Sequence, residues 1–308
     1  MAAAVGGDGR RQIPIQIGVP RSWNMSVNVG LAAGLRLAQI ETAVEKYQPP
    51  WLFLDQFSQF YGVDEGRETH DSSLTRCRGE RIRDNHAMAL TLYWGSGSPF
   101  SWRVLLALEH KRLPYESQLL HFDKQEHQSP QMLRLNPRGR VPVLKDGDYV
   151  VFESVAVMYY LDEKYPEPSI FGTTPEEAGV IMRVICEFQA YAEPAVLKIV
   201  EAIFADRVAE DVDALTDAMH LVGREARTIE GRLSKEEWIV GTHYSAIDMV
   251  IFPWIQVLRR ALNRASAKEL GARFLPMEQN YPALARWIHR IESLPGYDRT
   301  YPPHWRDP

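Results

Sequence analysis

The most constraining stretch of the chain is residues 90–109, where a short apolar segment leads through a glycine-rich turn into a second apolar run. Leu90–Trp94 predicts a strand, and Gly95-Ser-Gly-Ser98 predicts a tight turn because glycine permits backbone conformations closed to other residues. Pro99 suits the first helical position, since its φ is fixed and its missing N–H is not needed there. Ser98 then becomes the N-cap, beside free amides and the positive end of the helix. Taken alone, Ser98 is either a structural cap or part of an anion site.

Length and composition set the expected number of domains and argue against several classes of protein. With 308 residues, of which 45% are hydrophobic, the chain is long enough for two domains, or for one large domain with an extension. The net charge of −5 is spread over mixed signs without a long basic run, which argues against nucleic-acid binding. The sequence contains no run of about 18 apolar residues, so a membrane span is not expected. Cys77 and Cys186 are far apart, so we expect free thiols in a reducing, cytoplasmic setting.

Residues 1–87 show no sustained periodicity. The segment 66–85 is polar and charged, and such a composition buries too little apolar surface to offset its ordering entropy. We therefore expect a disordered or loosely helical N-terminal extension at residues 1–87. The alternative is that this extension is a partner-binding arm.

Residues 88–168 alternate between strand and helix patterns, in the order β-α-β-α-β-β-α. Strands are expected at 90–94, 115–121, 141–144 and 149–152, and helices at 99–111, 130–135 and 153–165. Pro142 interrupts the third strand, where it removes a hydrogen-bond donor. It therefore marks an edge strand, a bulge, or a cis bond that turns the Val141 backbone outward.

A Pro-, Gly- and Thr-rich linker follows Pro168 and runs to about residue 175, and the pattern beyond it is helical. Helices are expected at 176–206, 211–233, 247–262 and 281–291, the first of them kinked at Pro194. Ser245 and Asp248 have the spacing of a capping box that opens an apolar helix. The nine histidines show no metal-ligand spacing, so no metal site is expected.

Four motifs in this order resemble the cytosolic glutathione transferases. They are Ser98-Pro-Phe-Ser-Trp-Arg, Asn136-Pro-Arg-Gly-Arg-Val-Pro-Val-Leu144, Phe152-Glu-Ser-Val-Ala-Val-Met-Tyr-Tyr-Leu161 and the Ser245–Asp248 box. The resemblance implies an α/β plus all-α fold, with a thioredoxin-like domain at 88–168 and an all-helical domain at 175–308. It also implies glutathione as co-substrate, a small electrophile as second substrate, and a homodimer.

The same resemblance assigns the glutathione-binding residues. Val141, before Pro142, would offer its backbone to the cysteinyl amide, and Glu153 and Ser154 would bind the γ-glutamyl group. The alternative for Glu153 and Ser154 is a helix cap. Candidates for the glycyl carboxylate are Arg140, Arg138, Lys124 and Gln125.

Ser98 stands where serine-type classes keep the hydroxyl that activates the glutathione sulfur. The local motif resembles the omega-like Cys-Pro-Phe and zeta-like Ser-Trp-Arg patterns, with serine replacing the omega cysteine, so thiol–disulfide exchange is not expected. A serine hydroxyl can still stabilise a thiolate by donating a hydrogen bond. Tyr93 is the rival activator, followed by Ser96 and Ser101.

The leading hypothesis is an enzyme that conjugates glutathione to a hydrophobic electrophile in detoxification. One alternative is a glutathione-dependent isomerase or ether-cleaving enzyme, and another is a non-catalytic glutathione-binding or assembly protein of the same fold. The second substrate pocket is expected in the helical domain, with Phe188, Tyr191, Phe204 and Trp254 as candidate walls.

Overall fold

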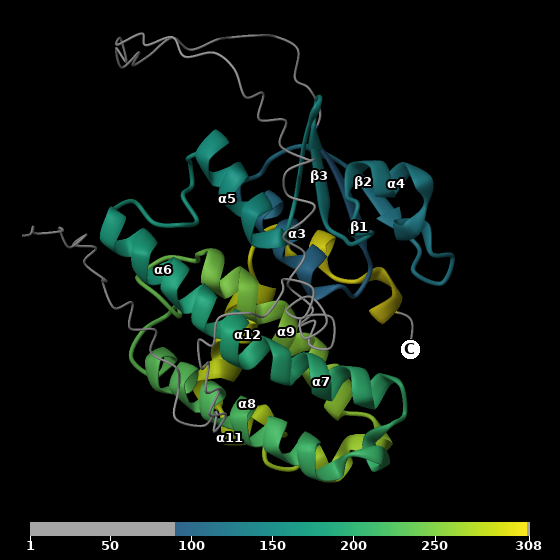
Figure 1. The fold of residues 1–308 in the computed structure, drawn as a ribbon. Coiled ribbons are helices and arrows are strands. Elements are labelled where there is room, and N and C mark those ends of the chain that lie inside the picture. The colour runs from purple at the N-terminus through teal and green to yellow at the C-terminus, as the bar shows by residue number, and fades with distance from the viewer. Residues whose placement is uncertain (1–89, 307–308) are drawn as a thin grey trace, which may run out of the picture. The chain divides into compact units, whose positions relative to one another are not determined.

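The computed structural model describes residues 90–306 (Figure 1). The expectations for residues 1–87 lie outside this range. Within it, the N-terminal part is a thioredoxin-like α/β unit and the C-terminal part is helical, as the sequence predicts. None of the helices between residues 90 and 306 has the length and apolar character needed to cross a bilayer.

Four strands form one mixed sheet in the order β2-β1-β3-β4. β1 (Leu90–Gly95) pairs in parallel with β2 (Tyr115–Leu120), because helix α3 (Pro99–His110) makes the crossover between them. β3 (Val143–Asp146) runs antiparallel to β1, and β4 (Tyr149–Phe152) returns antiparallel to β3. β1 is therefore central, and the turn that follows it leads directly into α3.

Helix α3 is the buried centre of the described region. Every residue from Ser101 to Glu109 is buried, because α3 packs against both α5 (Ser154–Lys164) and α9 (Ala246–Leu262). Figure 1 shows α3 between the strands and α9. This double coverage explains why the sequence of α3 is apolar on nearly all sides rather than along one stripe.

Helix α9 is the corresponding centre of the helical part. The capping box predicted at Ser245 and Asp248 is present. The Asp248 carboxylate also accepts hydrogen bonds from the Ile239 amide at 3.1 Å and from Trp287 Nε1 at 2.8 Å. Burial raises the pKa of Asp248 to about 6, although these donors favour its charged form. Asp248 thus links the start of α9 by hydrogen bonds to the segment at Ile239 and to the helix that carries Trp287.

Around α9 lie the other helices of this part. The longer ones are α6 (Pro175–Glu187), α7 (Glu193–Phe204), α8 (Val212–Leu233) and α12 (Pro282–Glu292), and the short ones include α10 (Lys268–Gly271), α11 (Met277–Asn280) and α13 (Tyr297–Thr300). The expected helix at 176–206 is divided by a π-helical turn at Phe188–Ala192. Pro194 lies at the second position of α7, where its missing N–H costs no intrahelical bond, and the π turn lies just before it.

The segment that joins the two parts is anchored rather than loose. Its residues Ile170 and Phe171 are buried, and the Asp162 carboxylate accepts hydrogen bonds from both of their amides. Lys111 at the end of α3 pairs with Asp162 at 2.6 Å. This buried pair fixes the junction between the sheet and the helices.

Candidate functional site

The structure brings the residues of three separate motifs to one cleft of about 600 Å³. The sequence-predicted residues in its wall are Ser98, Arg140, Val141, Pro142, Glu153 and Ser154. The other wall residues are Phe100, Phe122, His127, Asn136, Leu197 and Glu201. A cleft of this size suits a ligand as large as a tripeptide.

Ser98 lies at the N-terminus of α3 and caps it. Its backbone is extended, and its Oγ accepts a hydrogen bond from the Ser101 amide at 3.3 Å. Accepting that bond uses a lone pair of the oxygen and leaves the hydroxyl proton free to donate. Capping the helix and donating to an anion in the cleft are therefore compatible roles.

Two of the three rival hydroxyls form hydrogen bonds outside the cleft wall. Ser96 Oγ bonds to His304 Nδ1 at 2.6 Å, and Ser101 is fully buried with its Oγ accepting from the Gly95 amide. Neither Ser96, Ser101 nor Tyr93 is among the residues that line the cleft. Of the four candidate activators, Ser98 alone lies in its wall.

Glu153 and Ser154 start helix α5. Glu153 is the N-cap and has φ +69°, a left-handed value that is strained for a residue with a side chain. Its side chain makes no capping hydrogen bond, so the first amides of α5 keep their capacity to donate. A strained residue beside free helix amides is a feature of ligand sites. The alternative that Glu153 serves as a helix cap therefore lacks the side-chain hydrogen bond that such a cap makes.

Val141 and Pro142 precede strand β3 rather than lying inside it. The prediction of a strand at 141–144 is wrong at its start, because β3 begins at Val143. The Val141–Pro142 bond is cis, which is the third of the explanations considered for this proline. Both residues form part of the cleft wall.

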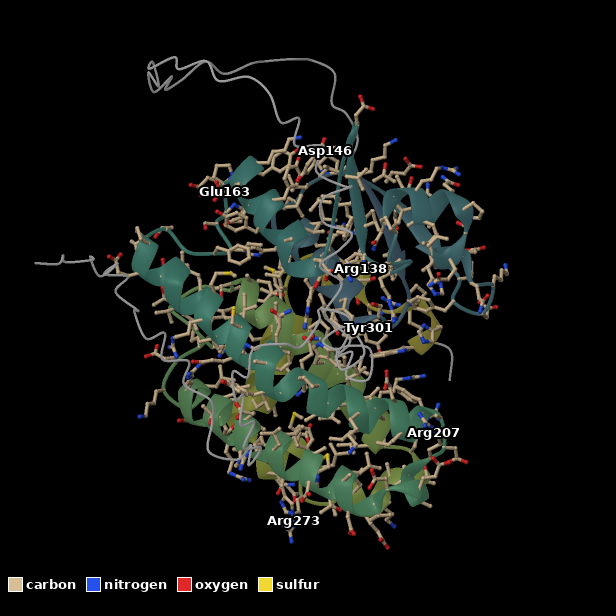
Figure 2. The ribbon with its side chains drawn as sticks, viewed as in Figure 1. Arg138, Asp146, Glu163, Arg207, Arg273 and Tyr301 are labelled. Carbon is tan, nitrogen blue, oxygen red and sulfur yellow. The ribbon has the colours of Figure 1, made fainter. Side chains whose placement is uncertain are left out.

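The connection between β2 and β3 contributes residues that sequence reasoning missed. His127, in the short 3-10 helix at Glu126–Gln128, lines the cleft, and its buried Nδ1 has no hydrogen-bond partner among the described residues. Asn136, after helix α4 (Pro130–Leu135), donates to the Arg140 carbonyl at 2.9 Å and so shapes the turn that leads into Val141. Arg138, labelled in Figure 2, is not among the residues that line the cleft, although its Nε lies 4.0 Å from the carboxylate of the wall residue Glu153. Lys124 and Gln125 do not line the cleft, whereas Arg140 does.

The four aromatic residues predicted to wall the second substrate pocket do not line this cleft. Phe188 and Trp254 are core residues, and Tyr191 and Phe204 are exposed outside the cleft. Phe100 and Phe122 from the thioredoxin-like part line the cleft together with Leu197 and Glu201, which are four residues apart on α7. Phe122 is 42% exposed and packs over Gly95, where a side chain would collide with its ring.

A buried arginine connects the cleft to the helical part. Arg103 of α3 has a fully buried side chain that donates to Ser154 Oγ at 3.2 Å and to the Val250 carbonyl at 3.3 Å. Its guanidinium also pairs with Glu193, at the start of α7, and Glu193 accepts from Trp254 Nε1 at 3.0 Å. Burial lowers the pKa of Arg103, and the neighbouring Glu193 carboxylate opposes this by favouring the charged guanidinium. Arg103 therefore ties the cleft residue Ser154 to two helices of the other part.

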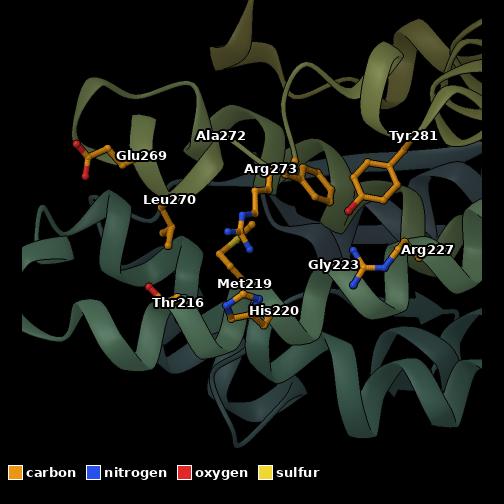
Figure 3. A pocket seen from close by; sticks show the side chains of 11 residues that line it. Thr216, Met219, His220, Gly223, Arg227, Glu269, Leu270, Ala272, Arg273 and Tyr281 are labelled. Atoms are coloured by element: carbon orange, nitrogen blue, oxygen red, sulfur yellow. The ribbon is translucent and has the colours of Figure 1, made fainter.

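A second hollow, of about 340 Å³, lies on the helical part beside α8 and α10 (Figure 3). Figure 3 shows Arg227 and Tyr281 reaching toward Gly223. None of the sequence-predicted site residues lines this hollow. Between residues 90 and 306, no group of three His, Cys, Asp or Glu side chains is arranged to hold a metal ion.

Comparison with known proteins agrees with this geometry. The family model described as the glutathione S-transferase N-terminal domain matches residues 88–163, and the model for the C-terminal domain matches residues 188–295. Glutathione S-transferase A of Pleuronectes platessa is 28% identical over 71% of this chain and 94% of its own length. A probable maleylacetoacetate isomerase of Vibrio cholerae is 27% identical over 71% of this chain and 99% of its own length.

Solved structures show the same fold. A glutathione S-transferase from the Antarctic clam Laternula elliptica superposes with a TM-score of 0.61 at 28% identity, over 71% of this chain and 95% of that one. The glutathione transferase URE2P6 from Phanerochaete chrysosporium, in complex with oxidized glutathione, gives a TM-score of 0.58 at 28% identity, over 72% and 97%. The chain therefore belongs to the glutathione S-transferase family.

Proposed function

We propose that this protein binds glutathione in the cleft and uses Ser98 to keep its sulfur ionised for attack on an apolar electrophile. The observation that carries the proposal is the position of Ser98, the one candidate activator in the cleft wall, with its hydroxyl proton uncommitted. The proposal also explains why the three motif segments converge there.

The activation needs no general base. A thiol has an ordinary pKa of about 8.5 and is mostly protonated at neutral pH. A hydrogen bond to a charged group contributes about 1.5–3 kcal/mol, and each pKa unit corresponds to about 1.4 kcal/mol. Ser98 at the positive end of α3 thus supplies a shift of about one to two units. The thiol proton leaves to solvent. The thiolate sulfur then forms a C–S bond with its own electron pair, and the leaving group on that carbon, such as chloride, departs to solvent with the electrons of the bond that breaks.

The polar wall residues match the functional groups of glutathione. The Glu153 carboxylate accepts from the γ-glutamyl ammonium, and the Ser154 amide and hydroxyl donate to the adjoining carboxylate. Ser154 Oγ accepts from Arg103, which leaves its proton free to donate, as at Ser98. Val141 offers its backbone to the cysteinyl unit. Arg140, next to Val141, and His127 are the donors for the glycyl carboxylate.

The remaining wall selects the second substrate. Phe100, Phe122 and Leu197 offer apolar and aromatic surface, and the Glu201 carboxylate is exposed beside them. A negative charge there disfavours substrates with several carboxylates. This favours an uncharged apolar electrophile, and it argues against the isomerisation of a maleyl-type diacid.

The remaining organisation follows the family pattern. We propose boundaries at 88–168 for the glutathione-binding domain and 175–308 for the helical domain, supported by the two family matches. We further propose a homodimer that acts in cytoplasmic detoxification.

Two measurements test the proposal. Isothermal titration should show glutathione binding, and conjugation of 1-chloro-2,4-dinitrobenzene should fall about eightfold to 25-fold at pH 7 in Ser98→Ala, which is the loss of thiolate when a pKa of about 6.5–7.5 returns to 8.5. Tyr93→Phe is the matched control and should stay near wild type. Binding without turnover in the wild type would favour the non-catalytic alternative. Full turnover in Ser98→Ala would exclude Ser98 as activator.

A further inference from the structure

The turn that contains Ser98 is contacted by His304, which lies far along the chain from it. Within Gly95–Ser98, the Ser98 amide donates to the Gly95 carbonyl at 3.2 Å, which closes the turn on itself. Ser96 does not line the cleft, and its Oγ hydrogen-bonds to His304 Nδ1 at 2.6 Å. These two residues are 208 positions apart in sequence.

The same histidine ring also covers the next residue of the turn. Gly97 has φ +79°, and a Cβ atom placed on it would lie 2.8 Å from His304 Cε1. Only glycine satisfies both the left-handed backbone and this close approach without strain. His304 therefore contacts two consecutive residues of the turn, one through a hydrogen bond and one through packing.

His304 is itself held firmly against α3. Its neighbour Trp305 packs edge-on against Trp102 at 5.4 Å between ring centroids, and the Arg260 guanidinium lies 5.0 Å from the Trp305 ring. Trp102 is a buried residue of α3 that also donates to Thr300 Oγ1 at 2.9 Å. The segment that carries His304 is thus anchored to the helix that Ser98 caps.

We propose that His304 is a positioning residue that acts through Ser96 and Gly97 to keep the Ser98 hydroxyl aimed at the glutathione sulfur. His304 does not line the cleft, so it reaches the reaction only through the turn. A small displacement of a donor from the position of a developing or bound charge weakens its effect strongly. The inference rests on the proposed role of Ser98.

Three substitutions of His304 separate its two contacts. Asn carries a polar amide atom two bonds beyond Cβ, as Nδ1 of histidine does, whereas the polar atoms of Gln lie one bond further out. Asn therefore keeps the bond to Ser96 and Gln does not. We expect His304→Ala and His304→Gln to lower kcat about three- to tenfold, the worth of one hydrogen bond, and His304→Asn to recover most of that loss.

The KM for glutathione should change little, because Val141, Glu153 and Ser154 are untouched. The pH at which the bound thiol ionises, followed by thiolate absorbance, should rise in His304→Ala and His304→Gln. Ser96→Ala breaks the same bond from the other side, and its effect should not add to that of His304→Ala. His243→Ala, in an exposed loop, is the control for removing a histidine.

The outcomes separate this inference from the proposed function. An unchanged kcat in His304→Ala and Ser96→Ala, with Ser98→Ala strongly impaired, overturns the role of His304 and leaves Ser98 in place. Equal losses in the Ala, Asn and Gln variants overturn the hydrogen bond to Ser96 as the cause. If Ser98→Ala retains full turnover, the proposed function itself fails. If His304→Ala does not fold, Ser96→Ala decides alone.

Discussion

Replacing Arg103 with methionine should destabilise the protein more than any exposed ion-pair substitution. The Arg103 side chain is fully buried and pairs with Glu193, whose side chain is only 13% exposed. Methionine fills much of the volume but leaves the Glu193 carboxylate with Trp254 Nε1 as its remaining donor among these partners. It also removes the hydrogen bonds to Ser154 Oγ and to the Val250 carbonyl.

The magnitude follows from the unpaired charge. Removing one partner of a buried pair costs about 3–5 kcal/mol, whereas an exposed pair contributes about 0–1 kcal/mol. Arg183 and Glu187 on α6 form such an exposed pair at 2.7 Å, so Arg183→Met is the matched control. For a folded region of this size, the cost to Arg103→Met corresponds to a Tm lowered by about 10 °C.

Urea unfolding followed by tryptophan fluorescence, and thermal unfolding, measure the difference. Adding Glu193→Leu to Arg103→Met should restore much of the stability, because the unpaired carboxylate is then gone. The KM for glutathione should rise in Arg103→Met and stay raised in the double variant, because Ser154 has lost its donor. A loss below about 1 kcal/mol, no larger than in Arg183→Met, would refute the reasoning about burial.

Three further predictions concern single residues. Burial lowers the pKa of His110 to about 4, so the unfolded chain binds the extra proton first as pH falls below about 6.5. The His110 contribution to the unfolding free energy should therefore fall by about 3 kcal/mol between pH 6.5 and pH 4. The raised pKa of Asp248 acts in the opposite direction over this range, so the quantity to follow is the difference in unfolding free energy between wild type and His110→Phe in urea titrations at each pH, which should shrink by that amount. Glu153→Gln should raise the KM for glutathione about tenfold, the effect of losing one charged hydrogen bond, while Glu163→Gln, at the exposed far end of the same helix, should not; equal KM values would contradict the binding role. Glu201→Gln should increase kcat/KM for electrophiles bearing a carboxylate several-fold and leave uncharged ones unchanged; no selectivity change would remove Glu201 from the substrate site.

Local features of the sequence predicted the thioredoxin-like part well. The strand, glycine turn and proline-started helix at 90–110 depend on short-range rules, and they appear as β1, the turn and α3. The helix at Pro130–Leu135 and the capping box at Ser245 follow from the same kind of rule. The motif residues of the site also meet in one cleft, as the family resemblance implies.

The predictions failed where tertiary packing, rather than local sequence, determines which residues are buried and which line the cleft. Aromatic residues at helical spacing do not reveal which face of a helix meets the core, so Trp254 was expected in a pocket and is buried in the core. Leu197 and Glu201 gave no signal, because nothing local in the sequence shows that this face of α7 lines the same cleft as Phe122. The π turn before Pro194 lies within a continuous helical pattern. His304 contacts the turn at Gly95–Ser98 only in the folded chain, and no spacing rule connects residues so far apart.

The most direct test of the account is the pKa of the glutathione thiol bound to the protein. Thiolate absorbance, titrated against pH on the wild type and on Ser98→Ala, measures it without any electrophile. We predict that the wild type lowers this pKa by about one to two units from 8.5 and that Ser98→Ala returns most of the shift. An equal pKa in both proteins, with glutathione bound in each, would contradict the assignment of Ser98 as the hydroxyl that keeps the sulfur ionised.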